Sequence, residues 1–388
     1  MICRFLRSNL QCPPLAKFNR RLLSTPSSTT LGTTKTVGTT KTVGTTTLGT
    51  TTHGTLPTET YHRKEAAFYN RYIRLRKSRK YRVQTNRAVI AGSKLIDELF
   101  HRTAPPFIHR LYLDATQPEW ERKRWEKKAE HATQITQEVG ITTTVHPSLS
   151  RGSDFPTMTG FSGSNEGVAA EIDLPVQLTA QAAATLVNKP NSRVLVLDAL
   201  QDPGNVGTLI RTAYLFGWDL VCLGSGSVDV SNDKVLRASG GTVFDQPVYG
   251  GPINGLITEI TKQCQHPVQY LVADHGVTGG GRGGDSAQGN GSSMSSQNVQ
   301  LVHNSTVVLV LGNEGNGVCT PTPKEIQDPT TITVTTREST VGSLGVASAG
   351  SILMHSLNVT QKHEKKTKKK KEKKLEKNEK KRRPKKTT

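Results

Sequence analysis

The chain has 388 residues, enough for two or three domains, and a formal net charge of +20. The charge is uneven: residues 1–58 carry +7, 59–150 carry +8, 151–360 carry −7 and 361–388 carry +12, which favours a polyanionic partner such as nucleic acid. Five cysteines without paired spacing argue against a metal site, and the absence of an apolar run of about 18 residues argues against a membrane span.

The first segment, residues 1–30, is rich in Arg, Leu and Ser and contains no acid, as in an organelle transit peptide. Its arginines favour a mitochondrion over a plastid, and a disordered basic tail is the alternative. Residues 31–59 follow with a six-residue Thr/Gly repeat, LGTTKTVGTTKTVGTTTLGTTTHGT. Nothing in this repeat supplies a core, so we expect a disordered linker.

Residues 60–150 are expected to form a small α/β module. A strongly basic helix comes first, followed by the strand RAVIAG and the helix SKLIDELF. The module is completed by the strand IHRLYLD, the charged helix PEWERKRWEKKAEHATQITQEVG and the strand ITTTVH. This alternation of helix and strand predicts a layered sheet. The basic helix is expected to contact RNA, with a solvated face as the alternative. Residues 151–192 are expected to be a connector.

Residues 193–360 are predicted to form the main domain. Five apolar stretches indicate strands, namely RVLVLDAL, DLVCLG, VQYLVADH, STVVLVLGN and TTITVT, and helices fall between them. Continuous apolar runs are typical of parallel strands that are buried on both faces. The Gly/Ser-rich insertion 276–300 is expected to be a disordered surface loop. The Lys-rich tail, 361–388, lacks an apolar face and is not expected to pack; RNA binding and a nucleolar-type address are both open for it.

Three motifs stand at the predicted strand ends: DPGNVGTLIR at 202–211, GNEGNG at 312–317 and ITVTTRESTVGSLGVASAGSILMHSL at 332–357. The first has neither the glycine spacing of a dinucleotide-binding turn nor the Lys-Ser/Thr of a P-loop. The glycines of the second let backbone groups approach a ligand closely. The small residues Ala347, Ala349 and Gly350 of the third allow close helix packing. Taken alone, each motif is also compatible with a simple buried turn.

In this order and spacing, the three motifs resemble the SpoU (TrmH-like) family of RNA 2'-O-ribose methyltransferases over about residues 190–360. Residues 70–115 resemble, more loosely, the N-terminal substrate-binding module of that family, which is similar to a ribosomal L30e-type fold. The resemblance implies an α/β fold of the SPOUT class, whose parallel sheet ends in a C-terminal trefoil knot, a rare exception to the rule against knots. It also implies S-adenosylmethionine as the cofactor, a homodimer and no metal.

The resemblance assigns roles to individual residues. The polar functional positions are Asn205, Arg211 and Glu314, and the cofactor is expected to meet the backbone at Gly312, Val334 or Thr335, and Leu344. Asn205 and Arg211 are expected to face the strand ends, where parallel sheets bind ligands. Asn205 serving only its turn, and Glu314 serving only as a first-turn acid of a helix, are the structural alternatives.

Arg211 corresponds to the arginine to which the family assigns the general-base role. A guanidinium stays protonated at neutral pH, so gripping an RNA phosphate with two hydrogen bonds suits it better. Its charge also favours ionisation of a nearby 2'-hydroxyl. We therefore expect Arg211 to orient the phosphate and to relay the proton.

The sequence departs from the family at its fourth polar position. Gly345 replaces the usual Asn, and Gly342 stands where an acid is usual. A side chain such as Ser343 or Ser348 then substitutes for the amide, or catalysis is weakened, or the chain only binds RNA.

The expected function is therefore S-adenosylmethionine-dependent methyl transfer to a ribose 2'-hydroxyl of RNA in a mitochondrion, with a plastid as the alternative. Ribosomal RNA is favoured over tRNA because the basic flanks suit a large structured RNA. The alternatives are a tRNA 2'-O-methyltransferase, a non-catalytic ribosome-assembly factor and a dinucleotide-dependent oxidoreductase; the glycine spacing argues against the last.

Overall fold

The computed structural model describes the following residues: 58–101, 108–136, 142–146, 154–160, 167–273, 294–295, 299–313, 317–318, 329–334 and 344–358. The expected transit peptide, the tail 361–388 and all but the last two residues of the expected linker lie outside this part of the chain. By contact density the chain divides into Met1–Thr55 and Leu56–Thr388, and the whole described part belongs to the second unit.

The front module contains a four-stranded sheet in the order β1-β4-β2-β3. Its strands are β1 (Arg87–Ala91), β2 (Ile108–Asp114), β3 (Thr142–His146) and β4 (Val168–Asp173). The first three match the expected strands. β4 comes from the stretch that was expected to be a connector, and it pairs antiparallel with both β1 and β2. The sheet of this module therefore extends past residue 150 to Asp173.

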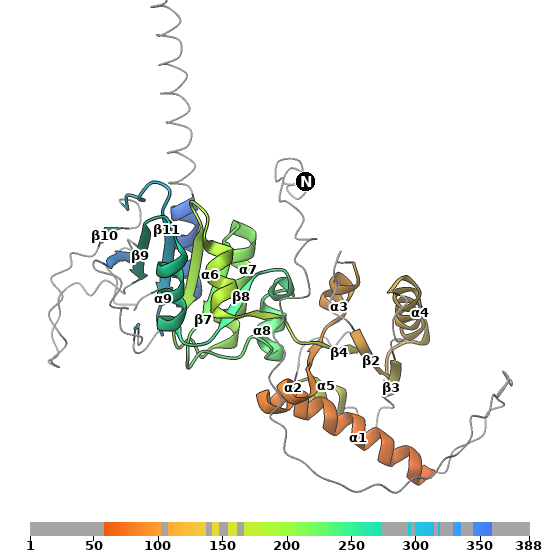
Figure 1. Ribbon diagram of the computed structural model, residues 1–388. Coiled ribbons are helices and arrows are strands. Elements are labelled where there is room, and N and C mark those ends of the chain that lie inside the picture. The colour runs from red at the N-terminus through yellow and green to blue at the C-terminus, as the bar shows by residue number, and fades with distance from the viewer. Residues whose placement is uncertain are drawn as a thin grey trace, which may run out of the picture. The chain divides into compact units, whose positions relative to one another are not determined.

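Helices cover both faces of this sheet (Figure 1). They are α1 (Thr58–Lys77), α2 (Arg79–Thr85), α3 (Ser93–Phe100), α4 (Glu119–Thr136) and α5 (Asp154–Thr159). Tyr72 of α1 and Phe155 of α5 pack with Val89 of the sheet. Ile96 of α3 and Trp125 of α4 share a separate cluster with the next strand residue, Ile90. The alternation along β1 thus assigns α1 and α5 to one face and α3 and α4 to the other.

The main domain contains an eight-stranded sheet in the order β10-β12-β9-β11-β6-β7-β8-β5, in which every pairing is parallel. The strands are β5 (Gln177–Leu178), β6 (Arg193–Leu197), β7 (Leu220–Leu223), β8 (Val248–Gly250), β9 (Val268–Ala273), β10 (Met294–Ser295), β11 (Thr306–Leu311) and β12 (Thr330–Thr333). The five expected strands are confirmed as β6, β7, β9, β11 and β12. The prediction that residues 276–300 form a disordered insertion is wrong near the C-terminal end of this range. There β10 forms a short strand that pairs with β12 and covers its edge.

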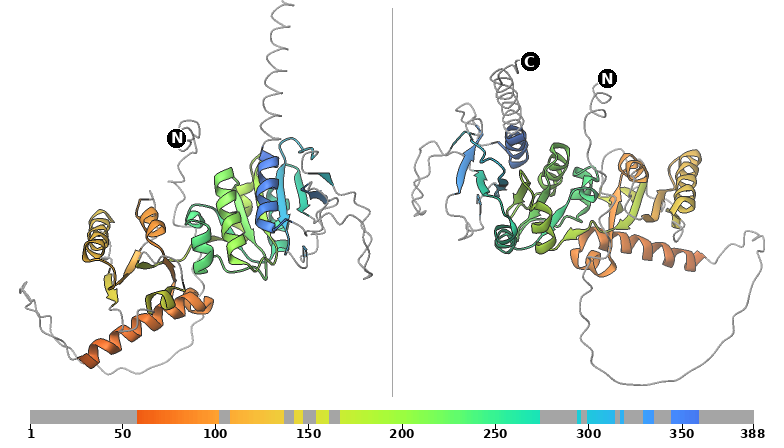
Figure 2. Two further views of the ribbon diagram at one scale, coloured as in Figure 1. Left: turned by 180° about the vertical axis from the view of Figure 1, so that it is seen from behind. Right: turned by 45° about the horizontal axis from the view of Figure 1, so that its top comes forward.

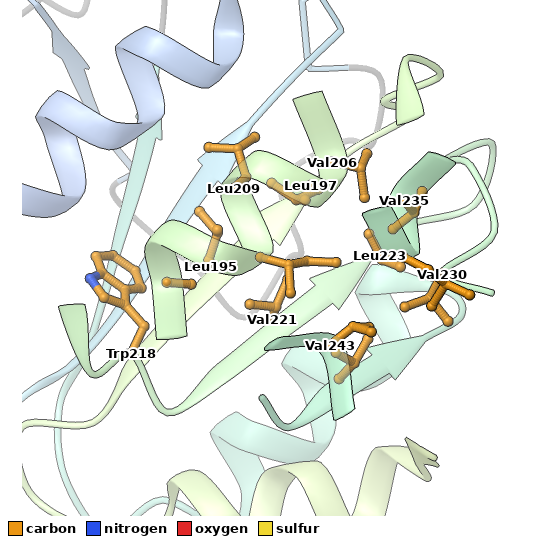
Figure 3. Packing of buried hydrophobic residues seen from close by; sticks show 14 of the residues in the cluster. Leu195, Leu197, Val206, Leu209, Trp218, Val221, Leu223, Val230, Val235 and Val243 are labelled. Carbon is orange, nitrogen blue, oxygen red and sulfur yellow. The ribbon is translucent and has the colours of Figure 1, made fainter. Parts of the chain in front are cut away.

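Two layers of helices bury this sheet (Figure 2). The helices are α6 (Ala180–Val187), α7 (Pro203–Phe216), α8 (Asp233–Ala238), α9 (Ile253–Gln263) and residues 346–358. Leu195 and Leu197 of β6 pack with α7 and α8, as Figure 3 shows, while Val194 and Val196 of the same strand pack with α6 and α9. Because alternate residues of a strand point to opposite faces, a continuous apolar run is what a doubly covered strand needs.

The contact between α7 and α8 depends on Gly207. A Cβ at this position would lie 2.5 Å from Ala238 Cβ and 2.7 Å from the carbonyl oxygen of Val235. We expect Gly207→Ala to lower the free energy of unfolding by about 1–3 kcal/mol, because backbone atoms cannot swing aside. Gly255→Ala is the control: nothing lies within 4 Å of its Cβ position in α9, so it should be neutral or stabilising. Urea unfolding measures both, and equal effects would contradict this packing account.

Arg82 connects the front module to the main domain. Its Nη2 donates to Oδ2 of Asp229 at 2.6 Å, and its Nε donates to Oγ of Ser231 at 2.9 Å. Its Nη1 donates to the carbonyl oxygens of Leu75 at 2.8 Å and Arg76 at 2.9 Å, at the end of α1. Arg82 is 3% exposed. One buried guanidinium therefore holds α1, α2 and the loop before α8 together.

The threading of a trefoil knot depends on residues 319–328 and 335–343, which lie outside the described residues, so the knot stays a prediction. In the part of the chain that the structure describes, none of the helices combines the length and the apolar character that crossing a bilayer requires.

Candidate active site

The first motif forms the start of helix α7. Oδ1 of Asp202 accepts the backbone N–H of Asn205 at 2.7 Å, so Asp202 is the N-cap. Pro203 takes the first helical position, where its missing N–H costs nothing, and Gly217 ends the helix with φ of 70°. The glycines at 204 and 207 lie inside this helix, which explains why their spacing fits no phosphate-binding loop.

Asn205 and Arg211 lie on this one continuous helix, not on a turn followed by a helix. Asn205 is half-buried in the first turn, whereas Arg211 is exposed almost two turns later. Helical geometry places six-residue neighbours about 120° apart around the axis, so the two side chains leave α7 in different directions. The expectation that a turn lets both face the strand ends is therefore corrected: the Asp202 cap starts the helix before Asn205.

The guanidinium of Arg211 lies along the loop that follows α8. Its Nη1 is 3.5 Å from the position of a Cβ on Gly240, which has φ of 58°. A side chain there would be strained and would press on the arginine. Within the described residues, no carboxylate forms an ion pair with Arg211. Its charge is therefore available to a ligand anion. Sequence reasoning missed Gly240, although the Gly-Gly pair that follows Ser239 is a recognisable turn sequence.

The second motif is a tight loop at the end of β11. Asn313 and Gly317 exchange two backbone hydrogen bonds of 2.8 Å. A Cβ on Gly312 would lie 2.3 Å from the carbonyl carbon and oxygen of Gly317, so only glycine fits there. Gly312 is thus in the expected position at a strand end, with its backbone close to the returning loop. Glu314 belongs to the loop between these residues and lies outside the described part.

Contacts bring the second motif against the segment that precedes the first. Nδ2 of Asn313 donates to the carbonyl oxygen of Ala199 at 3.1 Å, and the N–H of Asp198 donates to the carbonyl oxygen of Leu311 at 2.8 Å. Ala199 has φ of 53°, an unusual conformation for a residue with a side chain. This strained link holds the two motifs at the same edge of the sheet. Sequence reasoning missed Asn313, whose place directly after the strand was the available indication.

Asp198 is a further residue that the sequence did not single out. It directly follows β6 and is 1% exposed. Burial of Tyr270 is the main cause, and the charge of the Asp198 carboxylate the next, that raises the pKa of the Tyr270 phenol to about 12. The Tyr270 phenol therefore stays protonated at neutral pH.

The third motif also comes to this edge. Val334 follows β12, and residues 346–358 pack back on the sheet: a Cβ at Gly350 would lie 2.5 Å from Leu311 Cδ1 and 2.7 Å from Leu209 Cδ2. This confirms the predicted close packing at Gly350. Leu344, two residues before this helix, is 38% exposed. Thr335 lies outside the described residues.

Together these contacts define a candidate ligand site. The ends of β6, β11 and β12 carry the three motifs at the carboxyl edge of a parallel sheet, where such sheets bind ligands. Only glycine fits at position 312, and Leu344 is exposed. No cluster of His, Cys, Asp and Glu in the described ranges has the geometry of a metal site.

Known sequences are similar to the part of the chain that carries this site. Residues 192–355 match the SpoU rRNA Methylase family. The chain is 30% identical over 146 residues to the 23S rRNA (guanosine(2553)-2'-O)-methyltransferase RlmP of Bacillus subtilis, a match that covers 36% of this chain and 51% of that protein. It is also 30% identical over 175 residues to the mitochondrial rRNA methyltransferase 3 of Mus musculus, a match that covers 44% of this chain and 37% of that protein. The chain thus spans about half, or less, of the length of these relatives.

Solved structures share the fold over a larger part of the chain. An AdoMet-bound rRNA methyltransferase from Sinorhizobium meliloti has a TM-score of 0.54 at 19% identity, covering 75% of this chain and 93% of that one. The SpoU methyltransferase AviRb from Streptomyces viridochromogenes has a TM-score of 0.54 at 17% identity, covering 76% and 98%. The chain thus shares the α/β fold of these two structures, and the part of it that matches the SpoU rRNA Methylase family is residues 192–355.

Proposed function

We propose that the protein transfers a methyl group from S-adenosylmethionine to a ribose 2'-hydroxyl of RNA. The observation that carries this proposal is that the three motifs stand at the same edge of a parallel sheet, where the bond from Asn313 to Ala199 joins the second motif to the segment before the first. The family match and the relatives named for ribose 2'-O-methylation of rRNA support it.

The residues present fit such a cofactor. Gly312 lets the chain return closely against the end of β11. The backbone at Val334 and Leu344 offers donors and acceptors that suit an adenine. The exposed Leu344 side chain offers an apolar surface to the same ring. When bound, the cofactor supplies an electrophilic sulfonium methyl. Gly312, Val334 and Leu344 would hold it, with Thr335 as a further proposed contact.

The chain's own residues then position the RNA. Arg211 grips a phosphate beside the target ribose through two hydrogen bonds, and its charge stabilises the oxyanion that forms as the 2'-hydroxyl loses its proton. Asn205, at the positive end of α7, orients the ribose. Glu314 is proposed to orient these groups from the loop after Asn313. Positioning of this kind supplies much of the rate enhancement in a methyl transfer.

The basic helices α1 and α2 of the front module supply RNA contacts. Some of its arginines are used within the protein: Nη2 of Arg71 donates to Glu171 at 2.5 Å, and Nη1 of Arg76 donates to the carbonyl oxygen of Met158 at 2.6 Å. Among the described side chains of α1 and α2, the exposed cations are Arg74, which also lies over the Tyr81 ring, and Lys77, Arg79 and Lys80. We infer that these bind RNA phosphates, with ribosomal RNA preferred over tRNA. The mitochondrial relatives and the acid-free first 30 residues support a mitochondrial location.

We further propose a homodimer formed through α7 and residues 346–358. These helices lie against each other, with the Oγ atoms of Thr212 and Ser351 3.4 Å apart. Their outer surfaces expose large apolar side chains: Tyr214 is 43%, Leu215 65% and Ile352 41% exposed. Two adjoining helices with such residues form a surface suited to self-association.

Leu215→Glu tests this surface. A charge at its centre would be desolvated on association, so we expect a monomer at concentrations at which the unaltered chain is a dimer. Analytical ultracentrifugation measures the mass. Val176→Glu, at another exposed apolar residue that is 64% exposed, is the control and should leave the mass unchanged. A dimer that persists in Leu215→Glu would contradict the proposed interface.

Gly345 favours a second candidate function, a ribosome-assembly factor that binds RNA without modifying it. Gly345 is exposed just before the helix of residues 346–358, where an Asn side chain would reach the ligand edge. Single-turnover methylation of mitochondrial ribosomal RNA by the purified protein distinguishes the two functions. Methyl transfer supports the enzyme, and Gly345→Asn should then raise the rate. Cofactor binding without transfer, in both the unaltered chain and the variant, would support the assembly factor.

A further inference from the structure

Helix α4 of the front module has one buried face and one face that nothing described covers. Trp125 and Ala129 are 1% and 2% exposed and pack in the core cluster with α3 and the sheet. Figure 1 shows α4 on the outside of this sheet. The opposite face of the helix is therefore directed to solvent.

The outward face combines one aromatic residue with cations. Trp120 is 67% exposed, the largest exposed fraction among the exposed large apolar side chains in the described part of the chain. Spacings of three, four, seven and eleven residues place the other members on the same stripe of the helix. This outward stripe consists of Trp120, Lys123, Arg124, Lys127 and His131, all exposed.

Acidic residues border this stripe on both sides, with Glu121 on one side and three glutamates on the other. Glu119, Glu126 and Glu130 share a neighbouring row of the helix, also spaced by seven and eleven residues. Nζ of Lys123 lies 2.8 Å from Oε1 of Glu119, so this cation is partly neutralised. Lys127, in contrast, forms no ion pair with any described residue. The net charge around the indole is therefore positive.

Arg124 is partly fixed in place. Its Nη2 lies 3.9 Å from Oδ2 of Asp97, and its guanidinium carbon lies 5.6 Å from the ring centre of Trp125. Half of its side chain remains exposed. It therefore presents a positive charge one helical turn from Trp120, with less conformational freedom to lose than a free arginine has.

We propose that this stripe binds an unpaired stretch of the RNA substrate, with one base stacked on the indole of Trp120 and the adjoining phosphates held by Arg124 and Lys127. This inference rests on the proposed function. Every base offers a flat face to an aromatic ring, and the phosphates match the cations in sign. A duplex keeps its bases stacked inside the helix, so the surface selects loops and single strands.

Fluorescence tests the stacking directly. Trp120 is exposed, whereas Trp125 and Trp218 are 1% and 3% exposed, so a quencher that stacks on the surface acts on Trp120. Titration of the full chain with an unstructured 12-nucleotide RNA should quench emission, and an RNA duplex of the same length should not. Equal quenching by the single strand and the duplex, or no quenching by either RNA, would overturn the proposal.

Substitutions separate stacking from simple apolar contact. Trp120→Leu should weaken binding of the single strand about tenfold, whereas Trp120→Phe, which keeps an aromatic face, should retain most of the affinity. Val176→Ala, at an exposed site outside the module sheet, is the control. Equal losses for Leu and Phe would overturn stacking. Tighter binding of a poly-glutamate peptide than of RNA, lost in Trp120→Leu, would identify an acidic protein as the partner and would also overturn it.

Salt dependence tests the phosphate contacts. Lys127→Gln should lower the slope of log affinity against log salt by about 0.7, one phosphate contact on a single strand, and Glu130→Gln should not lower it. An unchanged slope in Lys127→Gln would contradict its role. Trp120-dependent RNA binding without methyl transfer would reject the proposed function alone. Methyl transfer with an unchanged KM in Trp120→Leu would reject this inference alone.

Discussion

Arg211→Lys is expected to lower kcat for RNA methylation by about 100-fold, although the charge is kept. An ammonium group is a single point donor, and it cannot reproduce the planar pair of hydrogen bonds to a phosphate. The side chain would also lose its contact along Gly240, where the Arg211 guanidinium lies 3.5 Å from the Cβ position. Transfer of a labelled methyl group to RNA under single-turnover conditions measures the rate.

Thr208→Ser is the matched control for this substitution. Thr208 is exposed one turn before Arg211 on α7, and its carbonyl oxygen, not its hydroxyl, accepts the hydrogen bond from Thr212. The control should keep the rate, and both variants should keep the melting temperature of the unaltered chain. A near-normal rate in Arg211→Lys would show that charge alone suffices and that the paired hydrogen bonds are not required.

The second large effect concerns the buried link between the front module and the main domain. Arg82→Met is expected to lower the free energy of unfolding by about 3–5 kcal/mol, because it leaves the Asp229 carboxylate buried without its cation. The two side chains are 4% and 10% exposed. Urea unfolding followed by circular dichroism gives the value. The double variant Arg82→Met, Asp229→Asn should regain part of the loss, and a loss that is the same in single and double variants would contradict a charge-based cause.

The pH dependence of this effect follows from the same pair. Burial raises the pKa of Asp229, but the hydrogen bonds from Ser231 and Arg82 outweigh it, so the net shift is downward. A lowered folded-state pKa contributes stability that is present above the unfolded value, about 3.9, and is lost as the pH falls through the folded value. The difference in stability between the unaltered chain and Arg82→Met should therefore shrink below about pH 4. A difference that grows in acid would be inconsistent with this assignment.

Apolar runs predicted the long strands of the fold and missed the short ones. Strands such as β6 and β11 are buried on both faces, so every residue after the first is apolar and the run is visible. β5, β8 and β10 have two or three residues each, too few for any period to emerge. β4 has the sequence VAAEID, and its two alanines and Glu171 interrupt the apolar run that would indicate a central strand. Glu171 is 3% exposed because Arg71 reaches it from 100 positions away, a contact that no local pattern encodes.

The candidate site was likewise predicted only in part from the sequence. The order of the motifs placed Gly312 and Val334 at strand ends, and the described structure has them directly after β11 and β12; Leu344 lies instead just before the helix of residues 346–358. The start of α7 was misread as a turn, although Asp202 followed by Pro203 is a helix-start sequence. The link from Asn313 to Ala199 and the contact of Arg211 with Gly240 join distant segments, so they needed the folded chain.

The central place of β4 in its sheet sets the order in which this protein can fold as it is synthesised. β1 and β2 both pair with β4 and not with each other, although β4 follows them in the chain. Until Asp173 leaves the ribosome, two strands of the front module have exposed edges, which are prone to pair with other chains. A ribosomal pause just after this point would let the module close before the main domain begins to emerge. Fragments made for study should accordingly end beyond Asp173, so that β1 and β2 keep the strand that joins them.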